Sequence, residues 1–358
     1  RRGRRITRMT KRPPRTLARD PVRDLIGQRR LMSKLATRAM RGDVAHAYGL
    51  FGPRSIGKRT AALRLAQTLN CATASVPGGC GACVTCRKID RGLHPDVRMV
   101  ARASDRKDIA IEQIREMLGD LSLRPLEGRT RVVILDDAAE MNQFGQDALL
   151  KTLEEPPSHA VLLLLTTTPS ALHETIRSRL QPLPFRLVPT AEIAEALAGR
   201  SLPEPGRHAA ASGGRPGLAI TLATEGAARA ARGAIEAELF RLVSSGLTDR
   251  FAWAADLADE PDPRRRSEAI ELRFDHWSEL LRDAAVAARG TLERPLRPER
   301  ASETARIAAA VSPREILEAS LLVERLRRDL AFNANSRAML ELLALRLPYA
   351  ADVKGAAA

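Results

Sequence analysis

Three residues in the segment 52–58 have the types and spacing of a phosphate-binding loop. Gly52, Gly57 and Lys58 fit G-x-x-x-x-G-K, between a short apolar run and a helical pattern. Such glycines let backbone N–H groups curl round a phosphate, and the helix N-terminus adds its positive end. The next residue should be Ser or Thr, whose hydroxyl binds Mg²⁺, but it is Arg59, and Thr60 comes one residue late. We predict that the loop shape is kept without this metal ligand, so the sequence does not establish that ATP and Mg²⁺ bind here.

Two carboxylates follow a second apolar run. Residues 131–135 predict a buried parallel strand, and Asp136 and Asp137 come directly after it. In phosphate-loop ATPases the first acid at this place holds Mg²⁺, directly or through water. The alternative is that both acids only cap the end of a strand. Because the loop lies upstream, we take Asp136 as the acid of a degenerate nucleotide site.

Four cysteines, all those in the chain, form one cluster in the sequence: Cys71, Cys80, Cys83 and Cys86. Cysteines two residues apart across a tight turn present two thiolates to one ion, and four thiolates complete a tetrahedral zinc site. The glycines between them supply the turns. Two disulfides are the alternative, which a reducing cytoplasm disfavours. We predict a structural Zn²⁺ site with no open position for catalysis.

Composition and charge narrow the class of protein. The chain has 358 residues, a net charge of +15 and 44% hydrophobic residues. No apolar run approaches the roughly 20 residues that a membrane-spanning helix needs, and no secretory segment follows the basic start. We therefore expect a cytoplasmic protein that makes no use of a membrane.

Basic residues are concentrated at the start of the chain. Residues 1–20 hold nine arginines and lysines against Asp20 alone. Such charge with few apolar side chains predicts a disordered tail. A basic arm attracts nucleic acids; the alternatives are a solvated extension, or residues upstream of a start at Met9.

Strand-like and helix-like segments alternate up to about residue 189. Strands are predicted at 48–51, 96–100, 131–135, 160–165 and 183–188, with helices between them. This alternation predicts βαβ units and a parallel sheet. Beyond it, three short helices are expected over 190–233 and longer Ala-, Leu- and Arg-rich helices over 234–358.

The combined pattern resembles one family, the bacterial DNA polymerase III clamp-loader AAA+ subunits, over roughly residues 21–350. The cysteine insertion together with the helix before Pro156-Pro157 is the most specific part of the resemblance. The residues that carry it are Leu25-Ile26-Gly27-Gln28, His46-Ala47, the loop at 52–58, the four cysteines, His94-Pro95-Asp96, Asp136-Asp137-Ala138, the segment 148–157, Arg177-Ser178-Arg179 and Asn333-Ala334-Asn335-Ser336-Arg337.

The resemblance implies an α/β AAA+ P-loop domain over 21–189, a parallel sheet flanked by helices with a zinc-knuckle insertion at 71–86. A helical lid at 190–233 and an all-α collar at 234–358 would follow. The ATPase subunits of this family, gamma and tau, have Ser or Thr after the loop lysine, Glu after the first acid, and an arginine in the lid. This chain has Arg59, Asp137 and Gly217 at those three positions. Three altered groups that serve one γ-phosphate indicate a non-hydrolysing chain, similar to the delta-prime type of subunit.

The resemblance also assigns a role to Arg179. The family's Ser-Arg-Cys motif places its arginine against the nucleotide of a neighbouring subunit, and Arg179 matches that arginine although Leu180 replaces the cysteine. An arginine finger stabilises the charge on a transferring phosphoryl group. The implied partners are gamma/tau and delta subunits in a hetero-oligomer, with a sliding clamp and primed DNA reached through the complex. The alternative for Arg179 is an ordinary surface residue.

Three other functions fit parts of the sequence. A gamma/tau-type ATPase that tolerates Arg59 and Asp137 would hydrolyse ATP by itself. A stand-alone zinc-knuckle protein would bind nucleic acid tightly without partners. A nucleotide kinase would use the loop, but the sequence has no evident acceptor site and gives the helical C-terminal third no role in such an enzyme.

Overall fold

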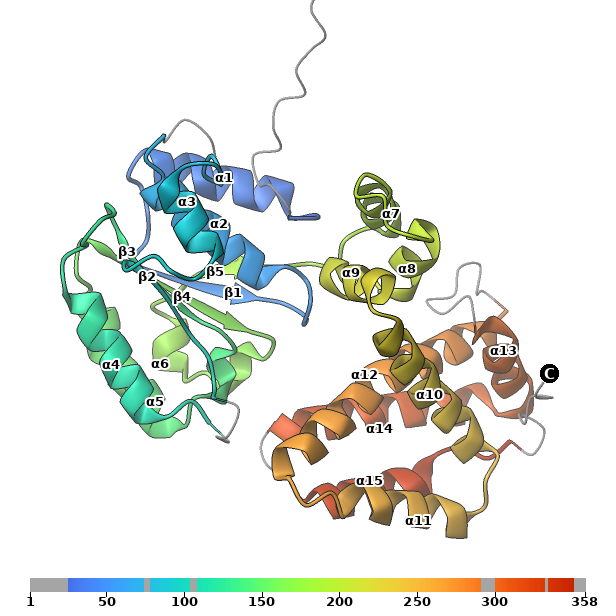
Figure 1. Ribbon diagram of the computed structural model, residues 1–358. Helices are drawn as coiled ribbons and strands as arrows, with labels where there is room; N and C mark the ends of the chain where they lie inside the picture. Colours follow the sequence, from blue (N-terminus) through green and yellow to red (C-terminus); the bar gives the residue numbers. More distant parts are fainter. Residues whose placement is uncertain (1–24, 74–77, 104–107, 291–299, 332–333, 351–358) are drawn as a thin grey trace, which may run out of the picture. The chain divides into compact units, whose positions relative to one another are not determined.

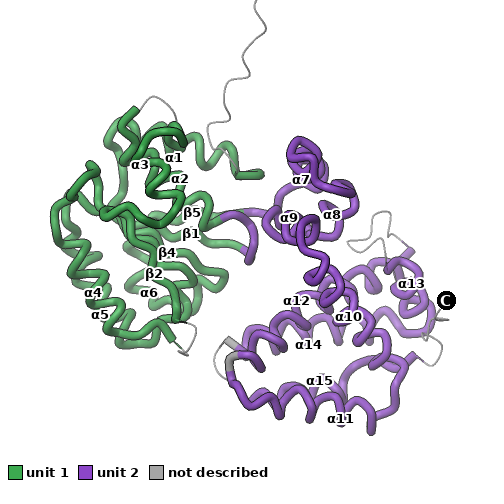
Figure 2. Tube along the Cα trace, in the orientation of Figure 1, with its two compact units in different colours: residues 1–52, 58–185 green, residues 53–57, 186–358 purple. Residues whose placement is uncertain are grey.

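The computed structural model describes residues 25–73, 78–103, 108–290, 300–331 and 334–350. It divides into two compact units (Figure 2), the first comprising Arg1–Gly52 with Lys58–Phe185 and the second Pro53–Gly57 with Arg186–Ala358. The expected tail at 1–20 and Asn333 of the late segment lie outside the described residues. The boundaries predicted at 189 and 233 between core, lid and collar stay predictions.

The first unit is built on a five-stranded sheet in which every neighbouring pair is parallel. Its strands are β1 (Ala47–Phe51), β2 (Val97–Val100), β3 (Arg131–Leu135), β4 (Ala160–Thr166) and β5 (Gln181–Pro184), in the spatial order β2-β3-β4-β1-β5. All residues of β3 and β4 are buried. Continuous apolar runs of this kind are expected where helices cover both faces of a sheet, and the predicted parallel sheet is confirmed.

Helices form a layer on each side of this sheet (Figure 1). One layer holds α1 (Arg29–Met40), α2 (Lys58–Asn70) and α3 (Val84–Asp90); the other holds α4 (Ile111–Ser122), α5 (Gln143–Glu154) and α6 (Glu174–Arg177). Alternate strand residues point to opposite faces. Val133, Leu135, Leu162 and Leu164 therefore share one face, where they form a core with residues of α4 and α5.

Two elements differ from the sequence expectation. The last strand covers Gln181–Pro184 rather than 183–188, and two prolines lie within it. Proline is tolerated there because β5 is an edge strand, bonded only to β1. The segment between β4 and β5, where a helix is expected, holds a 3₁₀ turn, Pro169–Ala171, and the single helical turn α6.

The described part of the second unit is helical. Its elements are α7 (Thr190–Ala198), α8 (Pro205–Ala211), α9 (Pro216–Thr224), α10 (Gly226–Val243), α11 (Leu247–Ala258), α12 (Pro263–Ala287), α13 (Ala301–Ala310), α14 (Pro313–Ala331) and α15 (Ser336–Arg346). Helices α10 to α15 share one apolar core. Trp253 and Trp277 meet in this core with ring centroids 5.4 Å apart, at an interplanar angle of 33°.

A buried arginine fastens the C-terminal segment to α11. Arg250 is 3% exposed and donates from Nη1 to the carbonyl oxygen of Leu347 at 2.5 Å and from Nη2 to that of Pro348 at 2.7 Å. Further donations reach the carbonyl oxygens of Leu242 and Val243. Since carbonyl dipoles rather than a carboxylate receive its donors, burial lowers the pKa of Arg250 below its ordinary value.

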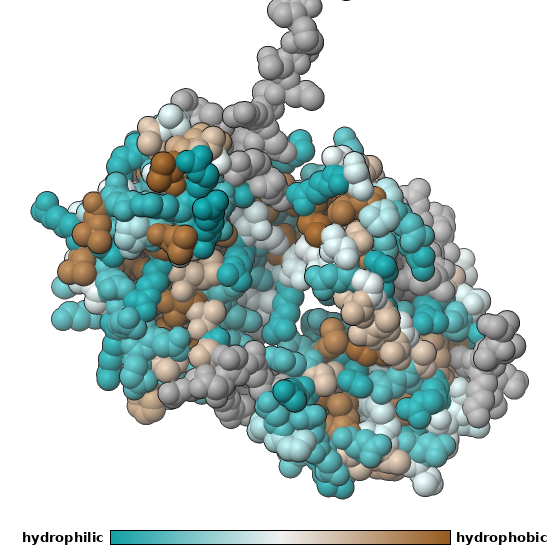
Figure 3. Space-filling model, in the orientation of Figure 1, coloured by the Kyte–Doolittle hydropathy of each residue, from teal (hydrophilic) through white to brown (hydrophobic). Residues whose placement is uncertain are grey.

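Hydrophobic residues on the face seen in Figure 3 occur in separate groups among hydrophilic ones on both units. Among the helices of the described residues, none has the length and hydrophobicity that crossing a membrane requires.

The carboxylate of Asp96 ties a loop of the first unit to the start of β2. It accepts from the backbone N–H groups of Leu126 at 2.7 Å, Glu127 at 2.8 Å and Gly128 at 2.7 Å. Arg131 Nη2 lies 3.4 Å from Asp96 Oδ1. Burial by itself raises the pKa of Asp96, but the backbone donors and the charge of Arg131 together bring it below its ordinary value.

Replacing Asp96→Asn should lower the free energy of unfolding by about 1–3 kcal/mol at neutral pH, because buried donors lose a charged acceptor. A group whose pKa is lowered by folding contributes stability above its unfolded pKa of about 4, and loses it as pH falls through the folded value. In urea unfolding, the difference in free energy of unfolding between wild type and Asp96→Asn should therefore have its largest value at pH 7 and shrink below about pH 4. The control is Glu155→Gln, which changes an exposed acid. If Asp96→Asn is as stable as Glu155→Gln at pH 7, the stabilising role of the Asp96 carboxylate is wrong.

Candidate functional site

The loop after β1 keeps the backbone form of a phosphate-binding loop. Gly57 has a φ of 103° and Ser55 a φ of 58°, in the left-handed region. A Cβ on Gly52 would lie 2.6 Å from the carbonyl oxygen of Phe185, so only glycine fits there. Lys58 begins α2, and its Nζ donates to the carbonyl oxygen of Gly52 at 2.5 Å. The loop lysine is thus folded back on the loop itself.

Arg59 and Asp136 meet at the carboxyl edge of the sheet. Arg59 Nη1 lies 3.7 Å from Asp136 Oδ2, and the two side chains are 65% and 28% exposed. In phosphate-loop enzymes the acid after this strand and a hydroxyl after the loop lysine hold Mg²⁺. Here a guanidinium takes the hydroxyl's place and pairs with the acid. The side chains present therefore do not fit a magnesium–nucleotide complex.

The backbone around Asp137 also has a defined form. Asp137 has a φ of 56° and precedes the 3₁₀ turn Ala138–Glu140. Its carbonyl oxygen accepts from the N–H of Glu140 at 2.9 Å. Aspartate tolerates the left-handed region better than most residues do. Its side chain is one methylene shorter than the glutamate that the ATPases of the resembled family carry.

Gly217, which stands where those ATPases carry a lid arginine, contacts the loop through its backbone. Its N–H donates to the carbonyl oxygen of Ser55 at 2.8 Å, and a Cβ on Gly217 would lie 2.9 Å from that oxygen. Both residues belong to the second unit. Any side chain at position 217 would force Ser55 or the start of α9 to move.

Arg179 lies between α6 and β5, on the surface of the first unit. Its Nη1 donates to the carbonyl oxygen of Thr175 at 2.8 Å and its Nη2 to Glu154 Oε1 at 2.9 Å. The Arg179 and Glu154 side chains are 36% and 53% exposed. Leu180, at the place of the motif's cysteine, is buried. The leucine holds the segment in the core while the arginine before it faces outward.

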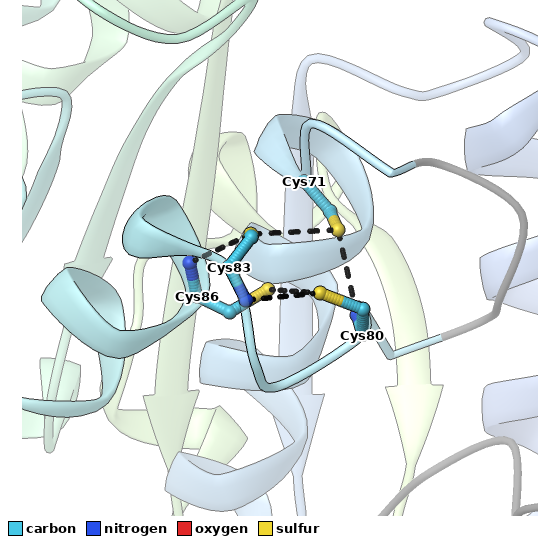
Figure 4. A group of neighbouring side chains, drawn as sticks. All are labelled: Cys71, Cys80, Cys83 and Cys86. Atoms are coloured by element: carbon cyan, nitrogen blue, oxygen red, sulfur yellow. Dashed lines mark hydrogen bonds between the residues drawn. The ribbon is translucent and has the colours of Figure 1, made fainter.

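The four cysteines lie together around the end of α2 and the start of α3 (Figure 4). All four are free thiols, and their Sγ atoms lie within 4.8 Å of one another. The separation is 3.9 Å for Cys71 and Cys83 and 4.0 Å for Cys80 and Cys86. A tetrahedron with Zn–S bonds of ~2.3 Å has S–S edges of about 3.8 Å. The geometry fits one tetrahedral metal ion, and no two of the four cysteines are joined by a disulfide.

The surroundings of these thiols support thiolates. The N–H groups of Ala82 and Cys83 donate to Cys80 Sγ at 3.4 and 3.3 Å, and that of Cys86 donates to Cys83 Sγ at 3.4 Å. A hydrogen bond from Thr73 and the backbone donors lower the pKa of Cys80 to about 5. Burial instead raises the pKa of Cys86. A cation bound among the four would supply the charge that the buried thiol needs to ionise.

One group of charges in the second unit was not found from the sequence. Arg215 donates to Glu279, and Arg232 Nε donates to Glu236 Oε1 at 2.8 Å. Both pairs lie between packed helices of the second unit. Burial raises the pKa of Glu279 to about 7. The only sequence signal is the four-residue spacing of Arg232 and Glu236, which is typical of an ordinary helix-surface pair.

These features define the class of protein. A parallel sheet with a phosphate-binding loop after β1 and an acid after β3 belongs to the P-loop nucleotide-binding class, altered here at the metal-binding positions. The comparisons with known proteins show which proteins the chain is similar to.

Residues 27–189 match the family described as DNA polymerase III, delta subunit. The delta' subunit of DNA polymerase III from Pseudomonas aeruginosa is 38% identical over 204 residues, covering 56% of this chain and 61% of that protein. The tau subunit from Escherichia coli is 38% identical over 156 residues, covering 44% of this chain and 24% of that protein. Over residues 27–189 the chain is therefore similar to the DNA polymerase III clamp-loader subunits.

The chain spans between 24% and 61% of the length of these relatives. Among solved structures, a gamma subunit-related protein from Thermotoga maritima matches with a TM-score of 0.40 and 17% identity, covering 87% of this chain and 97% of that chain. The fold class rests on the parallel sheet and its two helical layers.

Replacing Cys83→Ser should remove the bound metal and lower the melting temperature, because three thiolates hold the ion less well and the segment 71–86 loses its cross-link. Elemental analysis of the purified protein should give one zinc per wild-type chain and almost none in the variant. Val84→Ala, at the exposed neighbouring residue, should keep the metal. Full metal content in Cys83→Ser would contradict the four-thiolate site, and another metal in the wild type would contradict zinc.

Proposed function

We propose that this chain is a non-hydrolysing subunit of a DNA polymerase III clamp loader, of the delta-prime type, which lends Arg179 to the nucleotide site of a neighbouring ATPase subunit. The observation that carries the proposal is the pairing of Arg59 with Asp136 at 3.7 Å. The chain then acts as a rigid scaffold for subunits that do hydrolyse ATP.

The pairing supports loss of hydrolysis because phosphoryl transfer depends on positioning and charge. The metal ion bridges the β- and γ-phosphates and neutralises charge as it develops. The Arg59 guanidinium lies 3.7 Å from Asp136, where a metal ion would otherwise sit, and the position after Lys58 offers no hydroxyl ligand. The contact of Gly217 with Ser55 leaves no room for the lid arginine. Any anion held by Lys58 would be bound without turnover.

Arg179 is suited to act on another subunit because its internal contacts are weak. An exposed ion pair such as that with Glu154 contributes about 0–1 kcal/mol. A nucleotide phosphate carries more negative charge than a carboxylate and can accept two parallel hydrogen bonds from a guanidinium, whereas Glu154 accepts one from Arg179. A neighbouring nucleotide could therefore draw Arg179 from Glu154 at little cost.

Exposed apolar side chains on the last helices support assembly with other subunits. Leu317 and Leu321 are 44% and 61% exposed on α14, and Leu342 and Leu345 are 39% and 53% exposed on α15. Their spacings of four and three residues place each pair on one helix face. We propose that these helices form a collar with gamma/tau and delta subunits.

The remaining roles follow from the same proposal. The chain would consist of a core at 21–189, a lid at 190–233 and a collar at 234–358. As part of the complex, it would help to place a sliding clamp on primed DNA in the cytoplasm. Contacts of basic side chains with DNA phosphates would depend on salt and ignore sequence. Zinc would be structural, since all four of its positions are filled by thiolates.

A gamma/tau-type ATPase is the second candidate, because tau and gamma subunits match this chain at 37–38% identity, as delta' does. The delta' match extends over 204 residues and the tau match over 156. ATP hydrolysis by the isolated chain separates the two candidates.

Replacing Arg179→Ala should slow ATP hydrolysis at the neighbouring site, by on the order of 10³-fold or more if the arginine acts as a finger. The measurement is single-turnover hydrolysis by a loader reconstituted with gamma/tau and delta subunits. DNA-stimulated turnover should fall toward that of a loader lacking this chain, while native mass spectrometry shows an intact complex.

Two matched variants separate a finger from an internal contact. Arg177→Ala removes an exposed arginine two residues away and should keep full turnover. Glu154→Gln removes the internal partner of Arg179 and should also keep it. If Glu154→Gln lowers turnover as far as Arg179→Ala does, or Arg179→Ala changes nothing, the finger role is wrong.

A further inference from the structure

A second basic site lies within the helices of the second unit, away from the loop residues 52–58. A cavity of about 280 Å³ is bounded by residues of α8, α9, α10 and the start of α13. Four arginines line it, with Glu236 as the only carboxylate among its lining residues: Arg207, Arg229, Arg232 and Arg300.

Arg232 is the most deeply placed of these arginines. Its side chain is 6% exposed, and only its Nε is bonded, to Glu236 Oε1 at 2.8 Å. Both Nη atoms are buried and donate no hydrogen bond within the described residues. The nearest carboxylate oxygen to Nη2, Glu279 Oε2, is 4.0 Å away. A buried guanidinium without acceptors costs free energy unless a ligand satisfies it.

The other arginines differ in how far acids already neutralise them. Arg300 donates to Glu236 at 3.2 Å and to Glu303 at 3.0 Å, and Arg207 pairs with the exposed Glu204 at 3.1 Å. Arg229 instead donates to the carbonyl oxygen of Leu222 at 2.6 Å. Arg229, which no described carboxylate pairs with, therefore supplies charge for a ligand, and the Nη atoms of Arg232 supply hydrogen-bond donors.

Two titratable groups near Arg232 have pKa values that are shifted mainly by burial. Burial, and then the charges of Arg232 and Arg215, lower the pKa of His276 to about 3, so that imidazole is neutral. The pKa of Glu279 is raised to about 7, first by burial, so this acid neutralises Arg232 only partly near neutral pH.

We propose that this cavity binds a small phosphate-class oxyanion, phosphate or diphosphate, through Arg229 and Arg232. Guanidinium groups match phosphoryl oxygens with two parallel hydrogen bonds. The volume lies just below the ~300–1,000 Å³ of typical ligand pockets, which favours such an anion over a whole nucleotide.

The test uses the full chain carrying Lys58→Ala, so that the loop after β1 does not contribute phosphate binding. Sodium diphosphate is titrated calorimetrically and in thermal unfolding, against sodium chloride at equal ionic strength. Diphosphate should bind and raise the melting temperature with concentration, since a ligand of the native state stabilises it by mass action.

Arg232→Met should abolish diphosphate binding. If this change of a buried residue prevents folding, Arg229→Gln takes its place in the test. Arg229→Gln should weaken diphosphate binding by about tenfold or more, the effect of losing one charge-assisted contact. The matched control is Arg241→Gln, an exposed arginine of α10 outside the cavity lining, which should leave binding unchanged.

A single-stranded oligonucleotide titrated in the same way distinguishes a free anion from a nucleic-acid phosphate. Loss of its binding in Arg229→Gln but not in Arg241→Gln would assign the phosphoryl group to DNA at this cavity. No response of the Lys58→Ala chain beyond that to chloride, or equal responses of Arg229→Gln and Arg241→Gln, would overturn the proposal.

Discussion

Parallel strands all end at one edge of their sheet, and this constraint brings Arg59 and Asp136 together. Arg59 follows the loop after β1, Asp136 follows β3, and β4 lies between the two strands. The pair that results places the Arg59 guanidinium 3.7 Å from the acid that would otherwise hold a metal ion. The parallel sheet and the loop after β1 are kept, whereas the residues at the sheet edge differ from those that bind Mg²⁺ in phosphate-loop enzymes.

The same unit keeps a second ion site whose chemistry is complete. Four thiols converge at the end of α2, with backbone N–H groups directed at Cys80 and Cys83. Soft thiolates and hard carboxylates select different metals, so loss of a magnesium site at the sheet edge leaves the cysteine site unaffected. The cysteine site could hold a metal ion, while the loop after β1 carries an arginine where the hydroxyl ligand is expected.

The sequence predicted the parallel sheet and the cysteine cluster because both depend on local patterns, an apolar strand period and a short ligand spacing. It did not predict that Arg59 pairs with Asp136, since 77 positions of chain separate them and only the fold sets their distance. It placed β5 too late because prolines obscure an edge strand. The buried environment of Arg232 was missed because tertiary packing, rather than helical spacing, buries it.

The most direct test of the account is Mg²⁺-dependent phosphate release from ATP by the purified chain alone, with Lys58→Ala as the control. Because a guanidinium engages the acid and no hydroxyl follows the lysine, wild type and Lys58→Ala should be indistinguishable at background level. Steady phosphate release that requires Mg²⁺ and is lost in Lys58→Ala would contradict the account and make this chain an ATPase.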